Sequence, residues 1–277
     1  MPPSAQVLAA FGVASAAPTR LRGGQDVAWR AADLVLKPVD MPADALVWLD
    51  TVLRPRADGT DLRLGLPRRS RTGRLEVDGW CAFPFLAGRH EPGRWRDVAA
   101  VGRRFARLTA GLDRPGFLDA RTDPWAVADR FAWGEADPSG LRDEPSIAAL
   151  VARRSALHAS SGIVHGDLTG NVLFHPELPP ALIDLSLYWR PVPYGTAVVA
   201  VDAVCFAGAP LDLPEQLDDD PEFSQHLLRA LLFRMATDLL GGAGHEALTP
   251  YRAAVERVCA AAGEVSPSGT SPTILGF

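Results

Sequence analysis

The sequence predicts an α+β protein with two lobes, a small β-rich lobe over residues 1–86 and a larger helical lobe over residues 87–277. Three observations support this division. Short apolar runs separated by turn residues fill residues 19–86, whereas long amphipathic patterns dominate after Gly88. Between two of the later helical patterns lies a polar loop that leads into two short apolar strands, within residues 162–189.

The first lobe begins with small residues that lack the basic region of a signal peptide, so we expect a short helix ahead of the first strand. The segment PTRLRGGQDVAWRAADLVLKP predicts a strand, a turn at Gly23–Gly24, a strand near Val27–Arg30 and a strand at Leu34–Lys37. Apolar residues at helical spacing in ADALVWLDTVL predict a helix over residues 43–53. Residues 61–86 are expected to form a hairpin and then a strand that ends at Phe83–Pro84.

The second lobe is predicted to be mainly helical. We expect helices over residues 94–112, 146–160, 221–242 and 245–263. Pro250 could delay the start of the last of these helices. The proline-rich stretch 113–145 is expected to be loop-rich, and the tail after Glu264 is expected to be loose.

Composition argues against several classes of protein. A hydrophobic content of 47% and a charged content of 22% are ordinary for a globular chain. The net charge of −5 and the scattered arginines argue against a nucleic-acid partner, and the basic run 67–74 is expected to be a solvated turn. The three widely spaced cysteines suit neither a disulfide framework nor a zinc site, so we expect a cytoplasmic protein. No apolar run approaches the roughly 18 residues of a membrane span, so no membrane partner is expected.

The segment GIVHGDLTGNVLFHPELPPALIDLSLYW brings three polar side chains together. Folding its hairpin about the proline-rich turn places Asn171 opposite Asp184, and Asp167 lies four residues before Asn171. Mg²⁺ takes oxygen ligands, usually one or two carboxylates together with phosphate oxygens. A remaining carboxylate could orient a hydroxyl group and accept its proton. The alternative is that all three are ordinary turn residues that cap strands.

The segments HGDLTGN and LIDLS resemble the catalytic and metal-binding segments of the aminoglycoside phosphotransferase family, within the protein-kinase-like fold. HGDLTGNVLF with IDLSLYWRP is similar to a poorly characterised actinobacterial branch of that family. The resemblance implies that ATP binds between a nucleotide-binding lobe and a catalytic and substrate lobe, with Mg²⁺ and a small-molecule hydroxyl acceptor such as an amino sugar or an aminoglycoside. It implies that Asp167 is the catalytic base and that Asn171 and Asp184 hold the metal.

Lys37 is the only lysine among 28 lysine and arginine residues. In kinases of this fold a strand lysine contacts the phosphates and is held by an acid on the following helix. Lys37 ends an apolar strand just before the predicted helix over residues 43–53. A compact ammonium is not interchangeable with a planar guanidinium at such a site. We expect Asp50, or secondly Asp44, to pair with Lys37; the alternative is a surface lysine.

The resemblance also suggests further nucleotide-binding residues. Gly23 and Gly24, with Gln25, are expected to cover the phosphates, although adjacent glycines are also common in turns. Phe83 and Phe85 are expected at the hinge beside adenine or in the core.

Three other features have two readings each. His165 is expected to pack and hydrogen-bond within the loop without transferring a proton. Asp202 matches a helix-start acid that braces the catalytic loop, or is an ordinary N-cap. The acidic run 216–223 could attract a cationic substrate, or it forms a solvated loop with helix-start acids.

Two departures from the kinase pattern keep other functions open. Kinases place the metal-binding Asn five residues after the catalytic Asp, whereas the spacing here is four, so Asn171 is expected to coordinate differently. The predicted helix after Lys37 also lacks a glutamate. A non-catalytic, pseudokinase-like nucleotide-binding module is therefore the main alternative. A metal-dependent hydrolase using His165, Asp167 and Asp184 would leave Lys37 unexplained, and a protein kinase would need a longer segment than residues 185–215.

Overall fold

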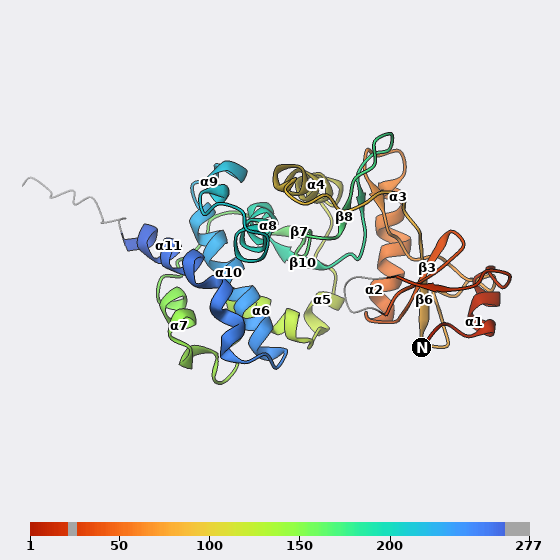
Figure 1. Cartoon of the computed structure of the whole chain (residues 1–277), viewed down its shortest axis with the longest axis horizontal. Coiled ribbons are helices and arrows are strands. Elements are labelled where there is room, and N and C mark those ends of the chain that lie inside the picture. The colour runs from red at the N-terminus through yellow and green to blue at the C-terminus, as the bar shows by residue number, and fades with distance from the viewer. Residues whose placement is uncertain (22–26, 264–277) are drawn as a thin grey trace, which may run out of the picture.

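The computed structural model describes residues 1–21 and 27–263, and its two lobes lie side by side (Figure 1). The N-terminal lobe holds a mixed arrangement of sheet and short helices, and the C-terminal lobe holds most of the helices. The predicted α+β fold with a β-rich first lobe and a helical second lobe is confirmed.

A five-stranded antiparallel sheet forms the centre of the N-terminal lobe, with the strand order β1-β2-β3-β6-β5. Its strands are β1 (Thr19–Arg20), β2 (Trp29–Ala31), β3 (Leu34–Pro38), β5 (Glu76–Val77) and β6 (Trp80–Pro84). Because side chains alternate along a strand, β3 places Leu34 and Leu36 on one face and Val35 and Lys37 on the other. The alternation therefore directs Lys37 to the face opposite Leu34 and Leu36.

Helices cover both faces of this sheet. The expected N-terminal helix is α1 (Ala5–Ala10), whose Val7 and Leu8 are buried with Leu34 and Leu36. On the other face, α2 (Ala43–Trp48) continues through a π-helical turn (Leu49–Leu53) into α3 (Arg54–Ala57). Leu46 of α2 packs against Cys81 of β6, so the predicted helix over residues 43–53 is confirmed and extends to Ala57.

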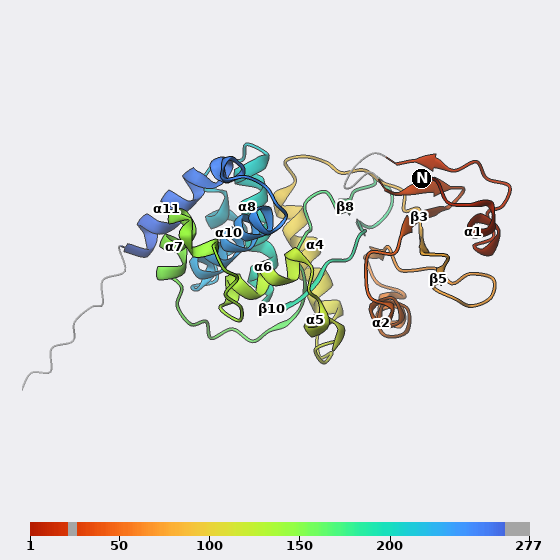
Figure 2. The same ribbon diagram turned by 90° about the horizontal axis from the view of Figure 1, so that it is seen from below.

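A second, three-stranded sheet joins the two lobes. It has the order β4-β9-β8, with β4 (Arg63–Leu64), β8 (Val172–Leu173) and β9 (Ala181–Leu182). Strand β4 runs parallel to β9, and β8 lies where the two lobes meet in the view from below (Figure 2). The prediction that residues 61–86 form a hairpin and then a strand is wrong for residues 61–66, and only β5 and β6 form a hairpin. The reason is burial, because Leu62, Leu64 and Leu66 pack in one core with Val172 and Leu182.

The C-terminal lobe is organised around α10, which packs against α6 and α8. Its helices are α4 (Trp95–Leu108), α5 (Phe117–Ala120), α6 (Pro124–Trp133), α7 (Pro145–Ala152), α8 (Val192–Phe206), α9 (Leu213–Leu217), α10 (Phe223–Leu240) and α11 (Arg252–Gly263). Short 3₁₀ helices occur at Leu141–Asp143 and His245–Tyr251, and strands β7 (Gly162–His165) and β10 (Leu187–Arg190) form an antiparallel pair. No helix in the described part of the chain combines the length and the apolar character needed to cross a bilayer.

The predicted helices of this lobe are present with changed boundaries. The helix predicted for residues 146–160 ends at Ala152, and the last helix proper starts at Arg252, after Pro250. The stretch 113–145 was predicted to be loop-rich, but it contains α6. Asp123 caps that helix by accepting a hydrogen bond from Ala126 N at 3.0 Å, and Pro124 begins it. These are ordinary helix-start features, and they outweigh the high proline content of the stretch.

Candidate active site

Lys37 lies where the two lobes meet and is paired with two carboxylates. Its Nζ atom donates to Asp184 Oδ1 at 2.6 Å and to Asp40 Oδ2 at 2.9 Å. Burial alone would lower the pKa of Lys37, but the neighbouring Asp184 and Asp40 carboxylates more than offset burial and raise it. The single lysine of the chain is therefore held in its charged form beside a residue of the opposite lobe.

The pairing of Lys37 with a helix acid is not found among the described residues. Asp50 instead accepts hydrogen bonds from Arg54 Nε at 2.8 Å and from Arg69 Nε at 2.7 Å, and Asp44 accepts one from the neighbouring Ala45 N in the first turn of α2. The prediction that Asp50, or secondly Asp44, pairs with Lys37 is therefore wrong. Asp40 follows β3 and lies only three residues after Lys37, so its carboxylate is close enough to pair with the ammonium.

The polar loop after β7 brings Asp167 and Asn171 into direct contact. The Asn171 side chain donates from Nδ2 to the Asp167 carbonyl oxygen at 2.7 Å and to Asp167 Oδ2 at 3.1 Å. Gly166 precedes Asp167 where a Cβ atom would lie 2.5 Å from the ring of Tyr188. The loop can therefore approach β10 this closely only with glycine at position 166.

His165 connects the loop to the segment around Asp184. Its Nδ1 atom accepts a hydrogen bond from Asp167 N at 3.0 Å, and its Nε2 atom lies 3.2 Å from the Asp184 carbonyl oxygen. Burial lowers the pKa of His165 to about 4, although Asp167 and Asp184 act in the opposite direction. The ring is thus neutral and buried, as a structural role within the loop requires.

The register of the hairpin differs by one residue from the prediction. Val172 pairs with Leu182, so Asn171 lies opposite Ile183, whose N–H donates to the Asn171 carbonyl oxygen at 2.9 Å. Phe174, which follows β8, pairs with Arg89 instead of with the second strand of the hairpin. Asp184 follows directly in a left-handed backbone conformation with φ of 51°.

A buried arginine, which the sequence analysis did not single out, contacts the proposed base. Arg234 of α10 donates from Nη2 to Asp167 Oδ1 at 2.8 Å and holds both oxygens of Asp202. Asp202 lies inside α8, near its end, so its interpretation as a helix-start or N-cap residue is wrong. Pro191 and Pro193 start this helix ten residues earlier than expected. An arginine within the apolar run LLFRMA would have indicated a buried acidic partner.

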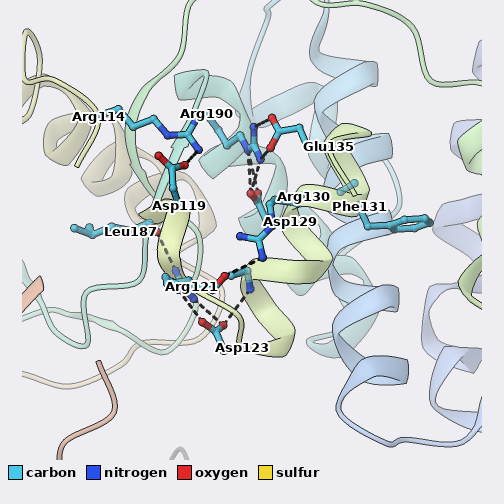
Figure 3. Close-up of polar contacts among 12 residues, drawn as sticks. Arg114, Asp119, Arg121, Asp123, Asp129, Arg130, Phe131, Glu135, Leu187 and Arg190 are labelled. Atoms are coloured by element: carbon cyan, nitrogen blue, oxygen red, sulfur yellow. Dashed lines mark hydrogen bonds and ion pairs between the residues drawn. The ribbon is translucent and has the colours of Figure 1, made fainter. Parts of the chain in front are cut away.

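Strand β10, which pairs with β7, is anchored by a network of ion pairs in α6 (Figure 3). Arg190 is 5% exposed and donates to Asp129 and Glu135 through two nitrogens each. Arg121 makes a two-pronged contact with Asp123, with both distances 2.9 Å. These contacts fix the strand against which the polar loop packs.

The aromatic residues expected at the hinge lie near Lys37 and Arg30. The Lys37 ammonium is 5.2 Å from the centre of the Phe83 ring, and the Arg30 guanidinium stacks 3.6 Å from the Phe85 ring. The backbone N–H of Phe85 donates to the Asp33 carbonyl oxygen at 2.7 Å, so it is already used within the first lobe. Gly23, Gly24 and Gln25, expected over the phosphates, lie outside the described residues.

The acidic run 216–223 is engaged locally. Asp218 and Asp220 accept hydrogen bonds from the backbone N–H groups of Asp220 and Glu222, and Glu222 accepts from His158. These contacts agree with the reading of the run as a solvated loop with helix-start acids.

Two protein oxygens near Lys37 suit a hard divalent cation. The Asp184 carboxylate is 58% exposed, and the Asn171 side chain donates its nitrogen to Asp167, which leaves its amide oxygen for another partner. Among residues 1–21 and 27–263 no group of three or more His, Cys, Asp or Glu side chains could hold a metal on its own. A cation here would therefore need further oxygens, as Mg²⁺ bound to a nucleotide has from the phosphates.

Solved structures with this arrangement of elements cover nearly the whole chain. The microcompartment-associated aminopropanol kinase superposes with a TM-score of 0.61 at 16% identity, covering 94% of this chain and 95% of the kinase. An aminoglycoside phosphotransferase from Alicyclobacillus acidocaldarius gives a TM-score of 0.58 at 14% identity, with 95% of each chain covered. Amicoumacin kinase bound to AMP-PNP and Ca²⁺ gives 0.57 at 13% identity, covering 88% of this chain and 87% of that one.

The chain has the fold of the small-molecule kinases. The sequence itself matches no known family model, and no curated protein is significantly similar to it. In that fold the strand order β1-β2-β3-β6-β5 places the lysine strand β3 in the middle of the first lobe, next to β6, which leads into the second lobe.

Proposed function

We propose that the protein is an ATP- and Mg²⁺-dependent phosphotransferase whose acceptor is a hydroxyl group of a small molecule. The observation that carries this proposal is the meeting of Lys37 from one lobe with Asp184, beside Asp167 and Asn171, from the other. A single ammonium facing two carboxylates and an amide is the set of groups that a nucleoside triphosphate with a divalent cation requires.

The residues where the two lobes meet have separate roles in nucleotide binding. Lys37 binds phosphate oxygens, and Asp40 keeps its ammonium in place. Asp184 and the amide oxygen of Asn171 hold the cation. Mg²⁺, when bound, neutralises charge on the phosphates. The complex of amicoumacin kinase with AMP-PNP and Ca²⁺ supports a nucleotide and a divalent cation in this fold.

The first lobe, residues 1–86, then carries most of the nucleotide site, and the second lobe, residues 87–277, carries the base and the acceptor site. Gly23, Gly24 and Gln25 cover the phosphates in this proposal, and Phe83 and Phe85 lie beside adenine. Since the N–H of Phe85 is already bonded to Asp33, adenine is bound by other backbone groups of the hinge.

Asp167 orients the acceptor and takes its proton. The acceptor oxygen attacks the γ-phosphorus, the bond from that phosphorus to the β–γ bridging oxygen breaks, and ADP leaves with the bond electrons. The proton of the acceptor hydroxyl passes to the Asp167 carboxylate. Most of the rate enhancement comes from positioning and from charge neutralisation, because the transition state is loose.

The acceptor is proposed to be an amino alcohol or an amino sugar. The similar structures include kinases named for aminopropanol and for aminoglycosides, and this similarity of fold supports the class of acceptor without selecting one compound.

The test is ATP consumption by the purified protein against amino alcohols, amino sugars, aminoglycosides and nucleosides, with Asp167→Ala as background. We expect one class of acceptor to stimulate ADP formation in the wild type and none to do so in the variant. Thermal stabilisation by ATP without turnover on any acceptor would favour the non-catalytic nucleotide-binding module instead.

A further inference from the structure

Arg234 links two carboxylates that lie on different elements. Its guanidinium donates from Nε to Asp202 Oδ1 at 2.8 Å and from Nη2 to Asp202 Oδ2 at 2.6 Å. The same Nη2 atom donates to Asp167 Oδ1 at 2.8 Å. One planar group in α10 therefore connects the middle of the polar loop to the buried end of α8.

The arrangement uses the specific shape of arginine. Two parallel donors match the two oxygens of Asp202, and the second hydrogen of Nη2 points to a different acceptor. Both Arg234 and Asp202 are largely withdrawn from water, with side chains 13% and 9% exposed. Burial alone would lower the pKa of Arg234, but Asp202 and Asp167 raise it, so the guanidinium stays charged.

Each oxygen of the Asp167 carboxylate has a different partner. Oδ1 is fixed by the charged guanidinium of Arg234, whereas among the described residues Oδ2 receives only the longer contact from the Asn171 amide at 3.1 Å. The Asp167 side chain is nevertheless 43% exposed. Its rotation is thus restrained on one side, and Oδ2 is the oxygen left to accept a hydrogen bond from an incoming hydroxyl.

We propose that Arg234 is a positioning residue, which holds Oδ1 of Asp167 against Asp202 so that Oδ2 faces the acceptor hydroxyl. This inference rests on the proposed function, because it assigns Asp167 the part of base. Arg234 acts through Asp167, and α10 and α8 supply the rigid frame. The short spacing between Asp167 and Asn171 leaves few loop residues to orient the carboxylate, and a distant helix does so in their place.

The first test compares rate constants for Arg234→Met, Arg234→Lys and a control, Arg257→Met, which alters an exposed arginine paired with Glu215 on the surface. We expect kcat of Arg234→Met to fall by about 10²-fold with KM for ATP within about twofold, because only the orientation of the base is lost. Arg234→Lys should recover little activity, because an ammonium cannot bridge both carboxylates. Arg257→Met should match the wild type.

A folding defect is separated from a positioning defect by two further measurements. The double variant Asp202→Asn/Arg234→Met removes the buried negative charge of Asp202, which Arg234→Met alone leaves unpaired. The double variant should therefore fold, and its kcat should remain as low as that of Arg234→Met. Guanidinium ion added to Arg234→Ala should restore part of kcat, because it can occupy the space that the side chain vacates. Wild-type kcat in Arg234→Met or in the double variant would overturn the proposal.

Crystal structures of the wild type and of Arg234→Met decide the inference even without turnover. We expect a single Asp167 rotamer in the wild type and more than one in the variant. An unchanged Asp167 rotamer in the variant would overturn the positioning role. If the wild type consumes no ATP with any acceptor, the proposed function fails, and the rotamer of Asp167 still decides the part of Arg234.

Discussion

Lys37 Nζ lies 2.6 Å from Asp184 Oδ1, although the two residues are 147 positions apart in the chain. The contact joins the β-rich lobe to the helical lobe, and Asp40 supports it from the side of β3. An ammonium already bound to the carboxylate that is proposed to hold the metal is preorganised for a phosphate chain that would contact both groups.

Lys37→Arg should therefore impair catalysis even though the charge is kept. The wider guanidinium would meet Asp184 and the Phe83 ring in a space now filled by a compact ammonium. We expect kcat/KM for ATP to fall by about 10²-fold, the scale of losing one preorganised donor. The measurement is ATP consumption with the best acceptor, alongside ATP-dependent thermal stabilisation. Arg142→Lys, the reverse exchange at an exposed pair with Asp137, should leave both unchanged.

Asp40 and Asp50 are expected to give different defects when each is changed to asparagine. Asp40→Asn removes one partner of Lys37 and should raise KM for ATP by about three- to tenfold, a modest effect because Asp40 is half exposed. Asp50→Asn should lower the free energy of unfolding by about 1–2 kcal/mol with KM unchanged, since the partners of Asp50 among the described residues are Arg54 and Arg69. Steady-state kinetics and urea denaturation distinguish the two. A rise in KM confined to Asp50→Asn would show that the helix acid serves Lys37 after all.

The sequence predicted the convergence of Asp167, Asn171 and Asp184 because it follows from local rules. The order of loop and hairpin brings these three residues to one end, whereas the contact between Lys37 and Asp184 joins the two lobes and was not predicted. These inferences need only strand periodicity and a short connection. They fail by one residue in the hairpin register. They also miss the pairing of Phe174 with Arg89, because it depends on a chain segment far away in the sequence.

The contacts that the sequence did not predict depend on tertiary packing. Arg234 lies 67 residues beyond Asp167, and nothing in the local pattern of α10 indicates which acid it meets. Strand β4 looks like part of an N-terminal hairpin, yet its leucines pack with the second lobe. The partner of Asp50, by contrast, could have been predicted from local sequence. Asp50 and Arg54 are four residues apart on one helix and form a favourable pair.

Gly166→Ala should destabilise the loop that carries Asp167. The added Cβ atom would lie 2.5 Å from two ring atoms of Tyr188, a side chain that is 6% exposed and has little room to move. We expect a loss of about 1–3 kcal/mol in the free energy of unfolding, the usual range for overpacking, together with reduced phosphate transfer. Gly162→Ala is the matched control in β7, because its Cβ would meet no atom within 4 Å, and it should change stability by less than about 0.5 kcal/mol. Equal stabilities of the two variants would show that Tyr188 moves aside freely.

His226 should make the stability of the protein depend on pH. Its ring is fully buried beside Trp133, and neither ring nitrogen has a hydrogen-bond partner among the described residues. Burial, with a smaller contribution from Arg229, lowers the pKa of His226 below 6.5, although the acidic residues at positions 218, 220 and 222 act in the opposite direction. The folded chain therefore resists a proton that the unfolded chain takes up as the pH falls below about 6.5.

The sign follows directly. Because the unfolded state binds more protons than the folded state in that range, the free energy of unfolding decreases as the pH falls, and His226 contributes its full stability only above about pH 6.5. Urea denaturation of the wild type and of His226→Phe between about pH 7.5 and about pH 5.5, one unit either side of the histidine pKa, should show a shallower slope in the variant. The difference is at most that of one proton, about 1.4 kcal/mol per pH unit. Identical slopes for the wild type and His226→Phe would mean that His226 is protonated in the folded state as readily as in the unfolded chain.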